Sequence, residues 1–260
     1  MQELKIRQTT SNKTVLTKAR EKQIRSLQQK KFRSELGLFL VEGAKGVLEA
    51  CASDLDIEEI FCTESFFTLN EDKLTKKCSK IVFVKESLLS KLGTFSSNNA
   101  AIAVIYIPKN EELVADNDFV ILLDEIKDPG NLGTIIRTAD WYGITKIICS
   151  NDSVDVFNPK VINATMGSFG RVKLFYTDFD EYLSKTQLPV FGAYLGGESI
   201  YSINYPSEGY LLMGNESKGI NSNLEKYVSN KITIPRKGTA ESLNVAIATS
   251  IICDNIMRPK

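Results

Sequence analysis

The sequence predicts an α/β protein of two units, the second of which is built on a mostly parallel sheet. Short β-rich runs alternate with helical stretches along most of the chain, as they do when helices connect the strands of a sheet. In the second half these runs are almost continuously apolar, beginning with Phe119–Asp124, which suits a parallel strand covered on both faces. With 43% hydrophobic residues, a chain of 260 residues can bury one large core or two modest ones.

The first unit opens with a basic helix over residues 14–35 that carries a thin apolar stripe. Strands and helices are expected to follow, with the strands at residues 38–41, 59–62, 81–84 and 101–107 and helices at 43–53 and 87–92 among the segments between them. The polar stretch 108–112 has no apolar periodicity and is a candidate linker. We therefore expect one domain over residues 1–108 and a second over residues 115–260.

The second unit alternates strands and helices in the way that builds a doubly wound sheet. Strands are expected at residues 119–124, 145–149, 190–194, 209–213 and 231–234. Helices are expected near residues 131–142, 158–167, 179–185 and 221–227. A last helix, starting at Ser242 and ending near residue 257, is apolar on nearly all sides. Such a helix is buried in its own core or against a partner.

The composition excludes several classes of chemistry. The chain contains no histidine, so histidine-based triads and histidine-ligated metal sites are excluded, and we expect no metal. The five cysteines are scattered without a Cys-x-x-Cys pair, which argues against a disulfide framework and fits a reducing cytoplasm. We find neither a membrane-spanning apolar run nor the apolar stretch of a signal peptide.

The charge is balanced overall but unevenly spread. Residues 1–33 hold ten lysines and arginines against two glutamates, a net charge of +8, so the remainder of the neutral chain carries −8. A basic leading segment points to a polyanion such as nucleic acid. A solvated, lysine-rich helix face would have the same composition, and charge alone does not separate the two.

Three polar, glycine-containing patches each follow an apolar run in the second half, at Asp128–Arg137, Met213–Ile220 and Ile234–Val245. Ligands of open α/β sheets bind beyond the carboxyl ends of the strands, where all three patches are expected. None of them matches the phosphate-binding loop or the dinucleotide-binding glycine pattern. Taken singly each patch has an ordinary reading, as a turn, a salt-bridged surface arginine or a capped core helix. Together they suggest loops that converge on one ligand.

Side-chain placement within the patches gives more specific expectations. In the first patch Asn131 is placed to cap the following helix, and Arg137 shares a helix face with Thr134 and Trp141. In the second patch Gly214 lets the backbone approach a ligand closely. In the third patch Ser242 is expected to cap the last helix.

The three patches resemble the three motifs of the SpoU-type (TrmH-like) RNA 2′-O-ribose methyltransferases of the SPOUT superfamily. The resemblance rests on the spacing of Asn131 and Arg137, on Gly214–Glu216 and on the third patch, and Ala164–Ser168 resembles the family's connecting segment. Residues 31–43 are similar to the opening of the family's L30e-like RNA-binding domain. The resemblance spans roughly residues 15–258.

The resemblance implies a fold, a co-substrate and an assembly. The C-terminal domain would contain a deep trefoil knot, which departs from the usual rule against threaded chains. The knot would hold S-adenosylmethionine, and the enzyme would be a homodimer joined through its knotted domains. The cofactor-binding residues would be Leu195, Gly214, Asn215, Ile234 and Leu243.

The implied reaction is transfer of a methyl group to a ribose 2′-OH of structured RNA, with ribosomal RNA favoured. An alcohol is a poor nucleophile until its proton is drawn off. The residues expected to act on it are Arg137, Asn131, Glu216, Ser242 and Asn244. An RNA phosphate path would be lined by Lys18, Arg20, Lys22, Arg25, Lys30, Lys31 and Arg33. A transfer RNA substrate, a non-catalytic RNA-binding protein of the same fold, and a methyltransferase acting on a small molecule or a tRNA base are the alternatives.

Overall fold

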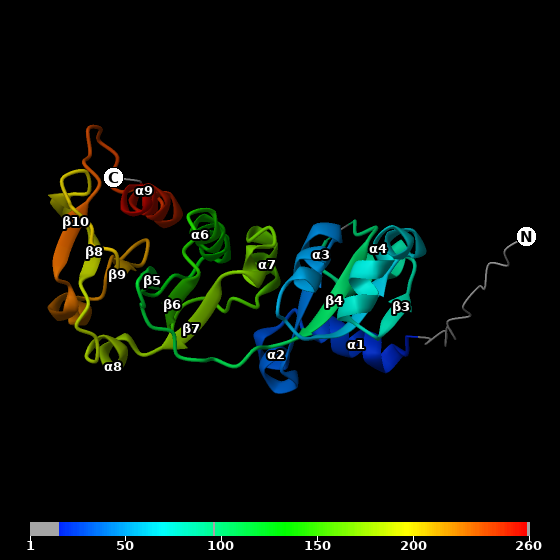
Figure 1. Ribbon diagram of the computed structural model, residues 1–260. Helices are drawn as coiled ribbons and strands as arrows, with labels where there is room; N and C mark the ends of the chain where they lie inside the picture. The colour runs from blue at the N-terminus through cyan, green and yellow to red at the C-terminus, as the bar shows by residue number, and fades with distance from the viewer. Residues whose placement is uncertain (1–15, 96, 259–260) are drawn as a thin grey trace, which may run out of the picture.

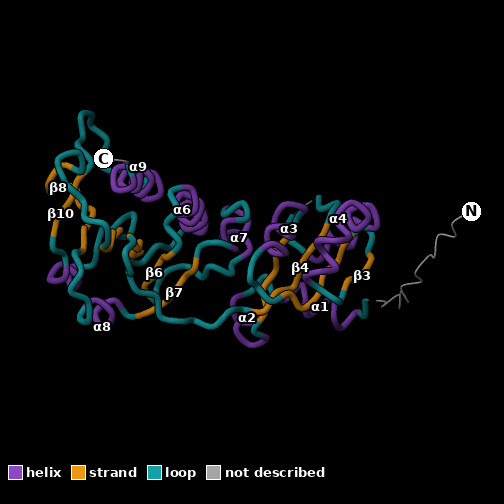
Figure 2. The backbone as a smooth tube through the Cα atoms, viewed as in Figure 1, coloured by secondary structure: helices purple, strands orange, loops and turns teal. Residues whose placement is uncertain are grey.

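The computed structural model describes residues 16–95 and 97–258. In them the chain forms two α/β units, each with a sheet of its own (Figure 1). The segment between the two sheets runs as a loop over residues 107–118 (Figure 2), which agrees with the expected linker. No helix in the described part of the chain is long and apolar enough to cross a membrane.

The N-terminal sheet has the strand order β1-β4-β2-β3, with β4 antiparallel to both of its neighbours and β3 parallel to β2. The strands are β1 (Leu38–Glu42), β2 (Ile57–Cys62), β3 (Ile81–Phe83) and β4 (Ala101–Tyr106). The helices are α1 (Lys18–Ser26), α2 (Lys30–Leu36), α3 (Ala44–Ala52), α4 (Glu64–Lys77) and α5 (Glu86–Leu92). Successive residues of β1 point into different cores, Phe39 into one and Leu40 into the other, so the sheet is covered on both faces.

The expected single helix over residues 14–35 is wrong in its continuity. Residues 14 and 15 lie outside the described part of the chain, and α1 and α2 are separated at Gln29, whose backbone is extended. The guanidinium of Arg33 holds the break in place. It donates to the carbonyls of Leu27 and Gln28, just before the break, and to Asp155 of the second domain.

The C-terminal sheet has the order β10-β8-β9-β5-β6-β7, and every paired neighbour is parallel. The strands are β5 (Phe119–Leu123), β6 (Lys146–Ser150), β7 (Lys173–Thr177), β8 (Val190–Ser199), β9 (Gly209–Met213) and β10 (Asn230–Thr233). The α-helices are α6 (Pro129–Trp141), α7 (Pro159–Ala164), α8 (Phe179–Leu183) and α9 (Val245–Met257), and the 3₁₀ helices are η1 (Ser168–Gly170) and η2 (Ser222–Tyr227). The mostly parallel α/β fold is thereby confirmed.

Central strand β5 explains why the sequence shows a continuous apolar run. Ile121 and Leu123 pack into the core beneath α6 and α9, whereas Val120 and Leu122 pack into the core beneath α8 and η2. The expected helical segment near residues 221–227 is the 3₁₀ helix η2, whereas the expectation omitted strand β7.

The two domains meet where the segment from Asp155 to Arg171 packs against β1 and α3 (Figure 1). The rings of Phe39 and Phe157 lie 4.7 Å apart, centroid to centroid. Two ion pairs cross the same boundary, Arg33 with Asp155 and Arg171 with Glu49. The interface therefore combines aromatic packing with paired charges.

Candidate active site

One hydrogen-bonded cluster joins the three patches of the C-terminal domain. The side-chain amide of Asn131 donates from Nδ2 to Oε1 of Glu216 over 2.6 Å. Its Oδ1 accepts a hydrogen bond of 2.9 Å from Nδ2 of Asn244. The expected convergence of the patches is confirmed at this point, because both ends of a single amide are used to hold them together.

Asn131 reaches its partners because another residue caps its helix. Oδ1 of Asp128 accepts the backbone N–H of Asn131 over 2.8 Å, and Pro129 occupies the first turn of α6. The expectation that Asn131 is the cap is therefore wrong by three residues. This difference matters for the site, because an Asn131 side chain bonded to the backbone of its own helix could not bond both Glu216 and Asn244.

A tight turn after β9 presents Glu216. The N–H and C=O groups of Asn215 and Gly219 pair with each other at 2.9 and 3.0 Å, and Nδ2 of Asn215 donates to the carbonyl of Glu125 over 2.8 Å. A Cβ atom at Gly214 would lie 2.2 Å from the carbonyl carbon of Gly219. Glycine at that position is therefore needed by the turn itself.

The third patch contributes the residue that caps α9. Oδ1 of Asn244 accepts the backbone N–H groups of Ala246 and Ile247 at 3.0 and 3.3 Å, while its Nδ2 binds Asn131. The expected cap, Ser242, is exposed and lies two residues before the cap in an irregular segment. Asn244 is favoured there because one side chain satisfies both the helix end and the neighbouring amide.

Arg137 lies on the outer face of α6, as predicted. Thr134 and Trp141 are exposed beside it, whereas Ile135 and Ile136 are fully buried on the opposite side. In residues 16–95 and 97–258 the Arg137 guanidinium makes no hydrogen bond or ion pair. It is therefore not bonded to Asn131 or Glu216 either. The group is thus free to bind an incoming oxygen or phosphate.

Four of the five predicted cofactor-binding residues lie within β8 or directly after β9 and β10, which are neighbours in the sheet. Consecutive residues of β10, Lys231 and Ile232, pair with Gly192 and Glu198 of β8, so residues 193–197 bulge out of this pairing as a loop within β8. Leu195 in that loop is 80% exposed, and its carbonyl accepts a hydrogen bond of 3.2 Å from Thr233. The loop therefore lies at the end of β10.

The other predicted cofactor residues flank this loop at the same edge of the sheet. Gly214 and Asn215 follow β9, and Ile234 follows β10, all three half-buried. Leu243, which precedes α9, is 49% exposed. Exposed apolar side chains beside backbone polar groups fit an adenine ring with its ribose.

Two residues that sequence reasoning missed support the site from below. Asp124, at the end of β5, is buried, and its Oδ2 accepts the backbone N–H of Asn221 over 2.8 Å. Burial raises the pKa of this carboxyl. Glu125 has a left-handed backbone with φ of 53°. The signal that could have found them is an apolar strand that ends in two consecutive acids.

The seven predicted RNA-binding residues fall into three groups. Five are exposed on α1 and α2, namely Lys18, Lys22, Arg25, Lys30 and Lys31. Arg20 is half-buried and bonds Glu58 and Glu59. Arg33 is 2% exposed and donates to Asp155 and to two backbone carbonyls. The expectation that Arg33 contacts RNA is therefore wrong, because no phosphate can reach it.

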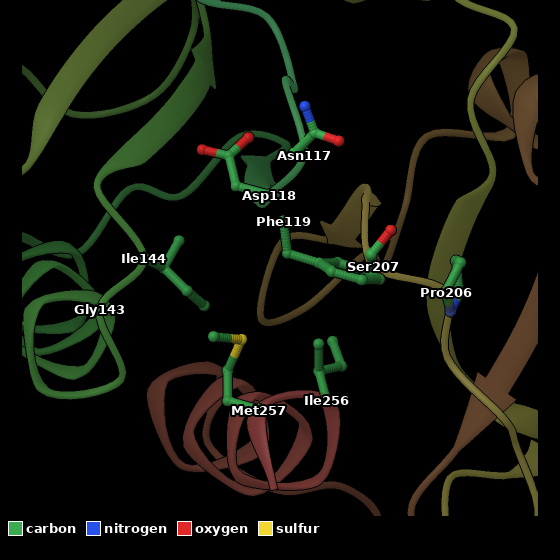
Figure 3. A pocket seen from close by; sticks show the side chains of 9 residues that line it. All are labelled: Asn117, Asp118, Phe119, Gly143, Ile144, Pro206, Ser207, Ile256 and Met257. Carbon is green, nitrogen blue, oxygen red and sulfur yellow. The ribbon is translucent and has the colours of Figure 1, made fainter. Parts of the chain in front are cut away.

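A hollow of about 250 Å³ lies at the opposite edge of the C-terminal sheet (Figure 3). Phe119 and Ile144, at the amino ends of β5 and β6, face Ile256 and Met257 of α9 across it. It is therefore distinct from the site built by the three patches. In the described part of the chain no group of acidic or cysteine side chains could hold a metal ion.

Comparison with solved structures defines the class of protein. The chain superposes on an AdoMet-bound rRNA methyltransferase from Sinorhizobium meliloti with a TM-score of 0.82 and 29% identity, covering 94% of this chain and 95% of that one. A TrmH-family protein from Porphyromonas gingivalis gives a TM-score of 0.83 and 33% identity, covering 93% and 98%. Fold and site together thus define a two-domain RNA methyltransferase.

Comparison of sequences assigns the family. Residues 118–254 match the SpoU rRNA Methylase family, and residues 18–103 match the MRM3-like substrate binding domain. The 23S rRNA guanosine-2′-O-methyltransferase RlmP of Bacillus subtilis is 30% identical over 232 residues, which cover 88% of this chain and 92% of that protein. The chain belongs to the SpoU rRNA methylase family, and the predicted family is confirmed.

Proposed function

We propose that the protein transfers a methyl group from S-adenosylmethionine to a ribose 2′-OH of ribosomal RNA. One observation carries the proposal. The hydrogen-bonded chain Glu216–Asn131–Asn244 unites the three patches at the start of α6, the helix that also presents Arg137, whose guanidinium has no partner within the described part of the chain. The relatives support the choice of substrate, since RlmP is named for 2′-O-methylation of 23S ribosomal RNA.

The co-substrate would be held by the bulge within β8 and by the loops after β9 and β10. Leu195 and Leu243 would cover the adenine, and the backbone around Gly214, Asn215 and Ile234 would bind the ribose and the polar edge of the base. When bound, S-adenosylmethionine supplies a methyl group that is already activated on a sulfonium. The residues of the chain have to orient the acceptor and manage its proton.

Arg137 would bind the 2′-oxygen of the substrate ribose. A guanidinium keeps its proton far above neutral pH, so it is a poor proton acceptor there. We therefore assign Arg137 the task of orienting the hydroxyl and stabilising negative charge on its oxygen. Asn131, held by Glu216 and Asn244, would fix the floor of the site, and Ser242 would line its rim.

The N-terminal domain would hold the RNA through the exposed cations of α1 and α2. Lys18, Lys22, Arg25, Lys30 and Lys31 make up this path after Arg33 is removed from it, and the half-buried Arg20 supports it from beneath. Each phosphate contact releases counterions, so binding should weaken steeply with salt. The proposed domain limits remain residues 1–108 and 115–260.

The assembly would be a homodimer formed by the C-terminal domains, whose chain we expect to be knotted. Trp141 on α6 is 83% exposed, and Ile247 on α9 is 52% exposed. Large apolar side chains left open on adjacent helices are typical of an interface. A ribosomal RNA substrate and five free thiols support a cytoplasmic location.

The deciding experiment measures methyl transfer from labelled S-adenosylmethionine to ribosomal and transfer RNA by the wild type and by Arg137→Ala. We expect 2′-O-methylated ribosomal RNA with the wild type and at least a hundredfold lower kcat with the variant, the scale of a lost transition-state contact. Unchanged S-adenosylmethionine affinity, measured by calorimetry, serves as the folding control. Methylated product in transfer RNA alone would show that the substrate is transfer RNA. A protein without affinity for S-adenosylmethionine would be a non-catalytic RNA-binding protein.

A further inference from the structure

Arg171, just after η1, joins the two domains through two carboxylates. Its Nε and Nη2 atoms donate to the carboxylate of Asp140 on α6 at 2.9 to 3.1 Å. Its Nη1 atom donates to Glu49 on α3 of the N-terminal domain. Ser168 adds a hydrogen bond of 2.7 Å from its hydroxyl to Asp140. Both oxygens of Asp140 are therefore occupied.

Asp140 lies three residues beyond Arg137 on the same helix. Side chains three apart on an α-helix are neighbours and form an ion pair when their charges are opposite. In the described part of the chain Arg137 makes no such pair, because the carboxylate of Asp140 is bound to Arg171 instead. The pKa of Asp140 is lowered by Arg171 first and by Ser168, so the carboxylate is charged and would attract any free cation nearby.

We propose that Arg171 is a positioning residue, which occupies Asp140 and thereby leaves Arg137 free to meet the ribose. The inference rests on the proposed function of Arg137. Without Arg171, the freed carboxylate captures the Arg137 guanidinium and draws it back along α6. An exposed ion pair on one helix lowers the free fraction of its partner about two- to fivefold, and kcat should fall by the same factor.

The test is a kinetic rescue in the full chain. Arg171→Ala is expected to lower kcat about two- to fivefold, with the KM for RNA and the affinity for S-adenosylmethionine unchanged. Adding Asp140→Ala removes the captor, and the double variant should regain most of the lost kcat. If Arg171 had a merely structural role, the double variant would have a lower kcat than the single one, because it has lost still more contacts.

Two controls isolate the effect. Lys173→Ala makes the same change in net charge at an exposed residue and should keep the wild-type kcat. Glu49→Ala removes the acceptor on α3 but leaves Asp140 bound, so kcat should also hold. Should Arg171→Ala unfold in a thermal melt, Arg171→Met and Arg171→Met/Asp140→Asn provide the same comparison with side chains closer in size to the originals.

The results separate this inference from the function on which it rests. Three results would each overturn the role of Arg171 alone. They are a wild-type kcat for Arg171→Ala, a double variant no more active than the single one, and an effect confined to the KM for RNA. A fully active Arg137→Ala protein would instead overturn the assignment of Arg137, and the role of Arg171 with it.

Discussion

Replacing Arg33 tests how much the buried ion pair at the boundary between the two domains contributes to stability. Its guanidinium is buried and donates to Asp155 over 2.6 and 3.1 Å and to the carbonyls of Leu27 and Gln28 over 3.0 Å each. Arg33→Ala would leave a carboxylate that is only 16% exposed without its partner. Breaking a buried pair from one side costs about 3–5 kcal/mol, so the free energy of unfolding should fall by that amount.

Urea denaturation followed by circular dichroism measures this loss. The matched control is Lys31→Ala, because Lys31 is 75% exposed and lies 3.9 Å from Glu35; an exposed pair of this kind contributes less than about 1 kcal/mol. Adding Asp155→Ala to Arg33→Ala should recover part of the loss, since the unpaired charge is then gone. A loss below about 1 kcal/mol in Arg33→Ala, accompanied by weaker RNA binding, would refute the reasoning and return Arg33 to the RNA path.

Two further predictions concern the site and the core. Gly214→Ala should lower the affinity for S-adenosylmethionine at least tenfold by calorimetry, because its Cβ would collide with the backbone of Gly219, whereas Gly196→Ala, whose Cβ would meet open space, should fold normally. Burial raises the pKa of Cys149 to about 12 from its ordinary value of 9. The unfolded thiol therefore ionises first as pH rises above 9, and unfolding should become easier by about 1.4 kcal/mol at pH 10. Cys149→Ala should remove that part of the alkaline slope, and an unchanged slope would contradict the assignment.

The sequence was sufficient for features that depend on local pattern. The continuous apolar run of β5 predicted burial on both faces, and the helical spacing of Ile135 and Ile136 against Arg137 predicted which face of α6 is outward. The pattern does not predict strand β7 because its residues are mostly half-buried and show neither a continuous nor an alternating burial. Patterns of burial can be recognised only where burial is complete or strictly alternating.

The capping residues show why the site itself was harder to predict. Ser242 and Asn244 are both good helix caps, and nothing in the local sequence separates them. The choice falls on Asn244 because its amide also reaches Asn131, which is 113 residues away. At the break before α2, Arg33 likewise bonds both the nearby carbonyls of Leu27 and Gln28 and the carboxylate of Asp155, which is 122 residues away. Local propensity leaves such alternatives open, and contacts distant in sequence decide them.

The exposure of Arg137 follows from how the other faces of α6 are used. One face is apolar and packs on the sheet. A second face forms a row of polar contacts, or polar seam, with α9. The hydroxyl oxygens of Thr138 and Ser250 lie 3.0 Å apart, and the Tyr142 hydroxyl donates to Oδ1 of Asp254 over 3.4 Å. The Asn131–Asn244 pair continues this row.

The polar pairs of this seam resist rotation of α6 about its axis, because any turn would leave the partly buried hydroxyl groups of Thr138, Ser250 and Tyr142 unpaired. The remaining face therefore has to point outward, and Arg137 lies on it. The availability of the proposed catalytic group is thus determined by the polar residues of α9 as much as by the first patch itself.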